Sequence, residues 1–196
     1  NCAPLALASL INMTYIQIDR LLTSGMLTLA DTSHLTAAQV IIMGVVEVLS
    51  TTILIAVYPM MARAYRGDGQ DTLFRFMVEK LAFFTLLIGL PIGLVFTLFA
   101  ADITVPLFGA NFLDVAPVLR VLIWYAVVTM VVNVFAQAFM TQNRQRRWVV
   151  IRVGGLVLKL ALSLLLLPRI GVVGAAAATL LAEGLILVLA AAVFAV

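Results

Sequence analysis

Apolar residues fall into six long runs that are separated by short polar clusters. Each run is about as long as the roughly 20 apolar residues that an α-helix needs to cross a bilayer, whereas strands of a membrane barrel would span about ten residues and alternate in polarity. Proline, glycine and charged residues mark the breaks between the runs. The pattern predicts an all-α, polytopic membrane protein: a six-helix transmembrane bundle with helices at 4–26, 35–62, 75–101, 116–142, 148–168 and 172–195.

The composition supports a membrane protein. Of the 196 residues, 64% are hydrophobic and 11% are charged, and the mean hydropathy is +1.19. Soluble domains are instead about half apolar and a quarter charged. Most basic residues lie at the predicted helix ends, where membrane orientation accounts for the net charge of +3, so we expect no nucleic-acid partner.

Charge along the connections predicts the orientation. The loops 27–34 and 102–116 contain no Lys or Arg, and the last connection contains only Arg169. Cytoplasmic loops are enriched in Lys and Arg, so the two basic connections should face the cytoplasm, and both ends of the chain should lie on that side of the membrane. The basic residues of these two connections are Arg63, Arg66 and Arg75, and Arg144, Arg146 and Arg147.

A lysine occupies the middle of the fifth predicted helix. Lys159 lies within the leucine-rich run 153–171, and a lysine at the centre of a spanning helix costs about 2.5 to 3.5 kcal/mol on insertion scales. Such a group faces protein or water rather than lipid. At helical spacing, Arg152 and Ser163 share its face, so the lysine belongs to a polar stripe.

Polar stripes recur on four other predicted helices, and they allow two interpretations. The polar groups either pair as structural glue, with Lys159 bonded to Glu183 because the two lie within roughly 4 to 5 Å in depth, or they surround a hydrated cavity. Five striped helices exceed what glue requires, which favours the cavity. The stripes comprise Asn12, Asp19 and Thr23; Gln39, Glu47 and Thr51; Asn133, Gln137 and Thr141; and Thr179 and Glu183.

Residues for redox, metal or hydrolytic chemistry are scarce. Cys2 is the only cysteine and His34 the only histidine, which excludes an internal disulfide and a zinc-ligand cluster of Cys and His. No phosphate-binding loop, HExxH or GxSxG motif occurs. We therefore expect neither an enzyme nor a cofactor or metal.

Four segments, taken in order, give the chain a family resemblance. They are "YIQIDRLLTSG" (15–25), "VYPMMARAYRGD" (57–68), "LFGANFLDVAPVLRVL" (107–122) and "LLLLPRIGVVGAAAATLLAEG" (164–184). With their spacing and the six spans, the whole chain resembles the C-terminal half of polysaccharide and lipid-linked oligosaccharide flippases of the multidrug/oligosaccharidyl-lipid/polysaccharide exporter superfamily.

The resemblance implies one six-helix lobe of a two-lobe transporter, with the N-terminal lobe outside this chain. A lipid-linked oligosaccharide or polysaccharide precursor, for example of lipopolysaccharide, would cross the cell inner membrane between the lobes by alternating access. Membrane lipid and the other lobe would be partners. Under this hypothesis Arg20, Arg152 and Lys159 bind the pyrophosphate, since a cation attracts it strongly in a low-dielectric cavity. The remaining site residues would be Asn133 and Gln137 around the sugar, and the acids Asp19, Glu47 and Glu183 for cation coupling.

Two other functions remain open at this point. A cation-coupled multidrug exporter of the same superfamily should present acids and aromatics without spare basic groups, so Arg20, Arg152 and Lys159 argue against it. A membrane scaffold that transports nothing would have its lysine and glutamate paired and its cavity dry.

Overall fold

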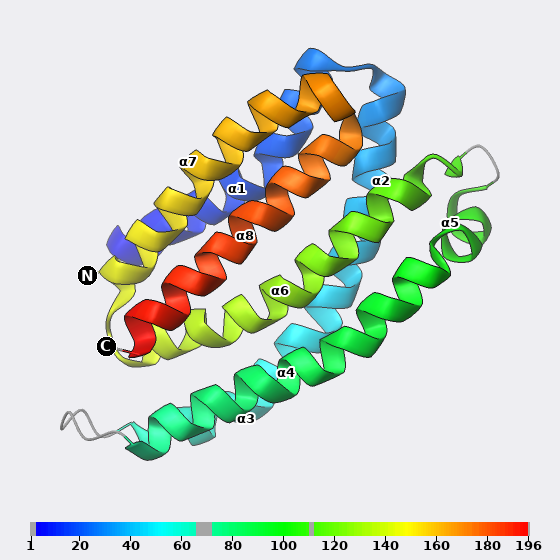
Figure 1. Cartoon of the computed structure of the whole chain (residues 1–196). Coiled ribbons are helices and arrows are strands. Elements are labelled where there is room, and N and C mark those ends of the chain that lie inside the picture. The colour runs from blue at the N-terminus through cyan, green and yellow to red at the C-terminus, as the bar shows by residue number, and fades with distance from the viewer. Residues whose placement is uncertain (1–2, 66–71, 110–111, 196) are drawn as a thin grey trace.

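The computed structural model describes residues 3–65, 72–109 and 112–195, and these ranges are helical with short connections (Figure 1). Among the described residues there is no strand. The elements are α1 (Ala3–Met26), α2 (Leu29–Val46), the π-helical segment η1 (Glu47–Thr51), α3 (Thr52–Ala64), α4 (Thr72–Leu98), α5 (Ala100–Phe108), α6 (Val115–Thr141), α7 (Gln145–Ile170) and α8 (Val172–Ala195).

Among the residues that the structure describes, five helical stretches are long and apolar enough to cross a membrane. They are Leu29–Ser50, Thr72–Leu98, Val115–Thr141, Gln145–Ile170 and Val172–Phe194. The prediction of an all-α polytopic membrane protein is confirmed. Helix α1 is 24 residues long but is not among these stretches, and it carries the adjacent charged residues Asp19 and Arg20.

The second predicted helix differs from expectation at its start and in its middle. It begins at Leu29 instead of residue 35, because Thr28 and Asp31 form a capping box: the Thr28 hydroxyl accepts from the Asp31 N–H, and the Asp31 carboxylate accepts from the Thr28 N–H. Most of the expected loop 27–34 is therefore helical. The same helix is interrupted by η1, and α5 occupies part of what was expected to be the loop 102–116.

Helix α6 is the centre of the bundle. It packs against α2, α4 and α8, and two-thirds of its apolar stretch (67%) is buried. Two glycines of α4 permit close approach: a Cβ on Gly89 would lie 2.9 Å from a methyl carbon of Val127, and one on Gly93 would lie 3.2 Å from another. Backbones can approach closely where such small residues meet, as is usual between membrane helices.

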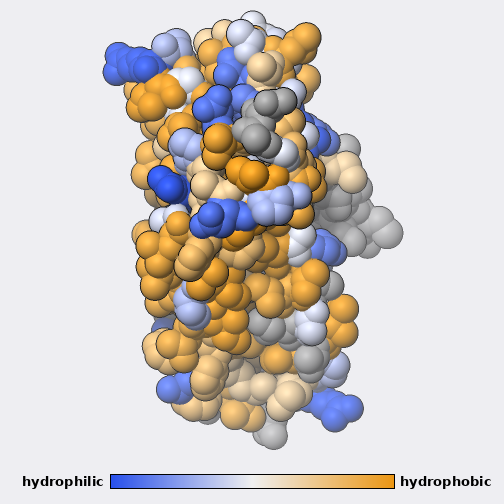
Figure 2. Space-filling model, turned by 90° about the vertical axis from the view of Figure 1, so that its right-hand side faces the viewer, coloured by the Kyte–Doolittle hydropathy of each residue, from blue (hydrophilic) through white to orange (hydrophobic). Residues whose placement is uncertain are grey.

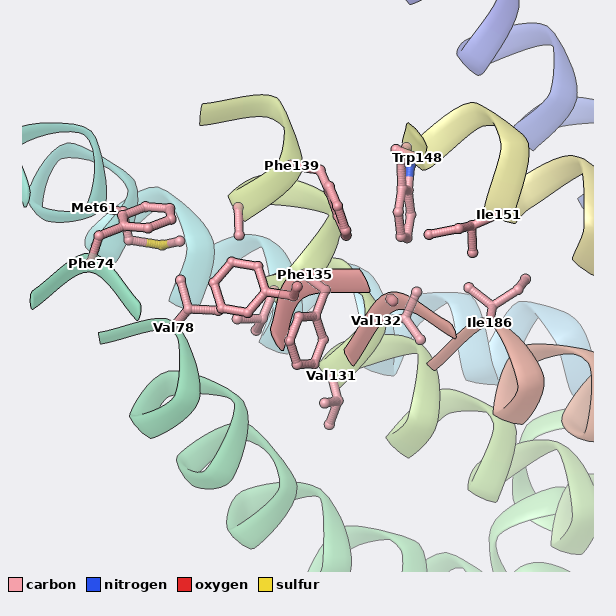
Figure 3. Close-up of a cluster of buried hydrophobic side chains, with 14 of the residues drawn as sticks. Met61, Phe74, Val78, Val131, Val132, Phe135, Phe139, Trp148, Ile151 and Ile186 are labelled. Atoms are coloured by element: carbon pink, nitrogen blue, oxygen red, sulfur yellow. The ribbon is translucent and has the colours of Figure 1, made fainter. Parts of the chain in front are cut away.

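A hydrophobic cluster rich in aromatic rings, called the aromatic cluster below, joins six helices and includes Tyr15 of α1 (Figure 3). It contains Met61 of α3, Phe74 of α4, Phe139 of α6, Trp148 of α7 and Phe194 of α8. The rings of Phe139 and Trp148 stack with centroids 5.8 Å apart and an interplanar angle of 26°. The cluster fixes the indole of Trp148 near the start of α7.

The outer surface is largely apolar. Only 17% of the apolar stretch of α4 is buried within the chain, and Phe76, Phe83 and Leu94 are exposed on it. Figure 2 shows apolar residues over much of one face, interrupted by hydrophilic groups. This surface suits contact with lipid chains, so the exposed apolar side chains of α4 do not need to be covered by another helix.

The turn between α7 and α8 gives a test of the packing. A Cβ on Gly174 would lie 2.5 Å from the carbonyl oxygen and 2.8 Å from the carbonyl carbon of Leu166, and backbone atoms cannot yield as a side chain can. We expect Gly174→Ala to destabilise the protein by about 1 to 3 kcal/mol through overpacking. Thermal unfolding of the purified protein in detergent measures this.

Gly184→Ala is the matched control on the same helix, because nothing lies within 4 Å of its added Cβ. Alanine is the better helix former by about 1 kcal/mol, so this variant should keep or raise the unfolding temperature. Equal behaviour of the two variants would contradict the observed α7–α8 packing.

Candidate functional site

A cavity of about 520 Å³ lies among α1, α2, η1, α6, α7 and α8. Its lining contains polar and charged side chains as well as apolar ones. The polar and charged lining residues are Asp19, Gln39, Glu47, Thr129, Asn133, Arg152, Lys159 and Thr179. The remaining lining residues are Ile42, Met43, Gly44, Val46, Leu122 and Tyr125.

Lys159 lies at the cavity wall with its donors already engaged. Its Nζ is 2.9 Å from Oδ2 of Asp19 and donates to the backbone carbonyl of Tyr15 at 2.5 Å. The same ammonium lies 4.0 Å from the centroid of the Tyr15 ring. An ammonium has three donors, so carboxylate, carbonyl and ring largely satisfy it. With 1% of its side chain exposed, Lys159 is a buried structural cation.

Asp19 connects three helices through this pair. It lies on α1, pairs with Lys159 of α7, and its Oδ2 accepts a hydrogen bond from the hydroxyl of Thr179 on α8 at 3.0 Å. The predicted glue pair of Lys159 with Glu183 is therefore wrong. The prediction compared depths in the membrane only, and depth does not determine toward which neighbour a side chain points.

Glu183 is instead the partner of Arg152. A single nitrogen of Arg152, Nη1, lies 3.2 Å and 3.3 Å from the two carboxylate oxygens. The Glu183 side chain is fully buried, whereas 12% of the Arg152 side chain is exposed. The guanidinium carbon lies 5.0 Å from the Trp148 ring centroid and 5.7 Å from that of Tyr15, within cation–π range.

The wall formed by α2, η1 and α6 contains both apolar and neutral polar lining residues, and its one charged residue at the cavity is Glu47, which is exposed. Asn133 Nδ2 donates to the hydroxyl of Ser50 at 3.0 Å, so an amide of α6 is anchored to the π-helical segment. Single π-helical turns frequently occur at functional sites. Arg20 Nε donates to Oε1 of Gln39 at 2.9 Å and thereby orients an amide that lines the cavity.

The structure brings together five of the eight site residues expected from the sequence. Asp19, Glu47, Asn133, Arg152 and Lys159 all line the cavity, whereas Arg20, Gln137 and Glu183 do not. Arg20 and Glu183 each contact a side chain that lines the cavity. Arg20 donates to Gln39, and Glu183 accepts from Arg152. We expected Arg20, Arg152 and Lys159 to be free to bind an anion. For Lys159 this is wrong, because its donors are engaged by Asp19 and by the Tyr15 carbonyl.

Tyr125 and Thr129 are cavity residues that the sequence analysis missed. A tyrosine near the end of a predicted helix is equally typical of an anchor at the membrane interface, so Tyr125 by itself does not indicate a cavity. The available signal was the spacing of four residues from Tyr125 to Thr129 and on to Asn133, which places all three on one face of a helix.

Buried ionised groups around a cavity, inside an all-helical bundle with an apolar exterior, are typical of membrane transport proteins. Residues 1–194 match the family Lipid II flippase MurJ, and the chain belongs to this family. Its members are transporters that move a lipid-linked precursor across the membrane, so the expectation of a lipid-linked precursor flippase is confirmed. No curated protein sequence matches the chain.

The pair of Asp19 and Lys159 gives a stability test. Lys159→Gln leaves a carboxylate buried at 3% exposure without its counter-ion, which costs about 3 to 5 kcal/mol when one partner of a buried pair is removed. Adding Asp19→Asn removes the orphaned charge and should restore much of the loss. Denaturant or thermal unfolding in detergent compares the three proteins.

The exposed pair of Arg75 and Glu79, with side chains 50% and 59% exposed, supplies the control. Glu79→Gln should change the unfolding free energy by less than about 1 kcal/mol. A Lys159→Gln protein as stable as Glu79→Gln would mean that the buried pair does not hold α1 in place.

Proposed function

We propose that this chain forms one lobe of a flippase that carries lipid II across the cell inner membrane by alternating access. The observation that carries the proposal is the ionised cavity at the centre of a bundle of this family. An apolar exterior keeps the lobe in lipid, while the cavity gives a polar headgroup a path that avoids the hydrocarbon. A multidrug exporter of the wider superfamily is not supported by the family match.

A second lobe would complete the cavity. Met43, Gly44 and Glu47 line it and are nevertheless exposed, so the α2–η1 side of the cavity is open in this chain. An N-terminal lobe facing this side would enclose a large headgroup, in keeping with the resemblance to two-lobe flippases. Transporters commonly bind substrate between repeats near the bilayer midplane.

Arg152 is the residue on this wall that can contact a pyrophosphate. A guanidinium carries five N–H donors in a fork that matches phosphate oxygens, and only Nη1 of Arg152 is engaged by Glu183. Lys159 has no comparable capacity, since Asp19 and Tyr15 occupy it. We therefore assign phosphate contact to Arg152 and a supporting role to Arg20.

The neutral polar groups suit the saccharide and its amides. Gln39 and Asn133 line the cavity and can exchange hydrogen bonds with hydroxyl and acetamido groups. Gln137 does not line the cavity, so it is left out of this contact set. Of the three acids expected to couple a cation, Glu47 fits best, because its carboxylate is exposed and forms no ion pair with a described residue.

The arrangement of the connections supports the proposed orientation. The end of α3, the start of α4 and the α6–α7 connection lie at one end of the bundle, together with the start of α1 and the end of α8 (Figure 1). Arg63, Arg75, Arg144, Arg146 and Arg147 lie in or beside these segments. Under the positive-inside rule this end faces the cytoplasm.

Translocation of lipid II in proteoliposomes that contain the complete transporter tests the function. Headgroup-labelled lipid II that reaches the outer leaflet becomes accessible to a membrane-impermeant reagent. We expect transport by wild type, and a rise in apparent KM of about ten- to a hundredfold for Arg152→Gln, the range for a lost hydrogen bond to a charged group.

Arg147→Gln is the control, because Arg147 is exposed at the start of α7 and does not line the cavity. It should transport like wild type. Failure of wild type to move lipid II would refute the proposed function, whereas full activity of Arg152→Gln would refute only the assigned phosphate contact.

A water-filled cavity can be tested by cysteine labelling after the native Cys2 is replaced by serine. Thiols react as thiolates, which need water, so Met43→Cys and Asn133→Cys should react with a charged, impermeant maleimide. Val157→Cys is exposed on α7 but lies away from the cavity, and should be protected by lipid. Ser163→Cys, at 1% exposure, should also be protected.

Labelling rates in native membranes give the comparison. If Asn133→Cys reacted no faster than Val157→Cys, the cavity would be dry and the non-transporting scaffold would become the better explanation.

A further inference from the structure

Two buried ion pairs join α7 to its neighbours, one to α1 and the other to α8, and their donor–acceptor distances differ. The Lys159–Asp19 pair is short at 2.9 Å, sealed from solvent, and reinforced by Tyr15 and Thr179. The Arg152–Glu183 pair has distances of 3.2 Å and 3.3 Å, longer than the roughly 2.7 to 2.9 Å of a strong charge-assisted hydrogen bond. The donors of Lys159 are thus fully used by short contacts, whereas Arg152 and Glu183 form a longer, weaker pair, called the loose pair below.

The loose pair is also exposed on one side only. Arg152 lines the cavity, whereas Glu183 is fully buried and does not line it. An anion in the cavity can therefore reach the guanidinium without contacting the glutamate. In the absence of such an anion, the glutamate neutralises the arginine and no uncompensated cation faces the cavity.

The aromatic surroundings allow the guanidinium to change partners. Trp148 and Tyr15 attract it through their ring faces, at 5.0 Å and 5.7 Å, and this attraction does not depend on particular hydrogen bonds. Trp148 itself is held against Phe139 in the aromatic cluster (Figure 3). The guanidinium can pivot between the carboxylate and the cavity while it stays between these rings.

We propose that Glu183 is an internal counter-anion that competes with the substrate phosphates for Arg152 and so promotes release of the cargo. The inference rests on the proposed function, because it concerns the phosphate contact assigned there to Arg152. It gives Glu183 a role different from cation coupling. A carrier gains nothing from binding its cargo too tightly, since tight binding in both orientations slows turnover.

The test is Glu183→Gln, which keeps the shape of the side chain and removes its charge. In the lipid II translocation assay, we expect the apparent KM and the maximal rate both to fall, each by about tenfold, the factor that corresponds to about 1.4 kcal/mol. Loss of a residue that merely positioned Arg152 would instead raise KM. A raised or unchanged KM overturns the proposal.

Binding of inorganic pyrophosphate to the purified transporter separates this inference from the proposed function. Glu183→Gln should bind pyrophosphate about tenfold more tightly than wild type, and the double variant Arg152→Gln, Glu183→Gln should lose that gain. If wild type failed to transport lipid II, the proposed function would fall, but this comparison would still decide whether Glu183 competes with phosphate for Arg152.

Two further variants serve as a control and as a substitute for Glu183→Gln. Glu79→Gln removes an acid from an exposed pair outside the cavity and should leave transport and pyrophosphate binding unchanged. If Glu183→Gln does not fold, Glu183→Asp retracts the carboxylate from Arg152 without removing the charge, and tighter pyrophosphate binding is again expected. Weaker or unchanged binding by a folded variant at this position refutes the competition.

Discussion

The rest of this structure depends on the need to neutralise ionised side chains inside a membrane. Asp19 and Lys159 would each be costly in hydrocarbon, and together they form a buried pair 2.9 Å apart that joins the first long helix to α7. Thr179 extends the contact to α8. Helix α1 is not among the five apolar stretches described above, and this polar contact ties it to α7 and α8.

Charge neutralisation also shapes the cavity. Its wall carries two cations and two acids, and Glu183 stands behind one of the cations. The cavity is thus polar without being strongly basic, and its ionised groups differ in availability. Lys159 is committed to the architecture, whereas Arg152 and Glu47 remain accessible to a solute. This division could not be inferred from counting charges along the helices.

Much of the fold could be predicted from the sequence, because the length of each apolar run and the punctuation between runs are local properties. Every predicted span overlaps a helix of the structure. The start of α2 was missed, since the capping box at Thr28 and Asp31 lies within a segment that looks like a polar loop.

The contacts within the site were harder to predict from the sequence than the helices. The seven-residue spacing of Arg152 and Lys159 placed both at the cavity, but their partners depend on how α1 and α8 pack against α7, and that packing is not local. Tyr125 was missed because a tyrosine near a helix end is equally typical of a membrane interface.

The π-helical segment η1 divides one long helix between two environments. A π turn holds one residue more than an α turn, so the side chains that follow it are rotated by about 100° relative to an uninterrupted helix. Before η1, α2 presents Gln39 to the polar cavity; after it, α3 buries Met61 in the aromatic cluster. A single inserted position thus lets one continuous helix present side chains in two different hydrophobic registers.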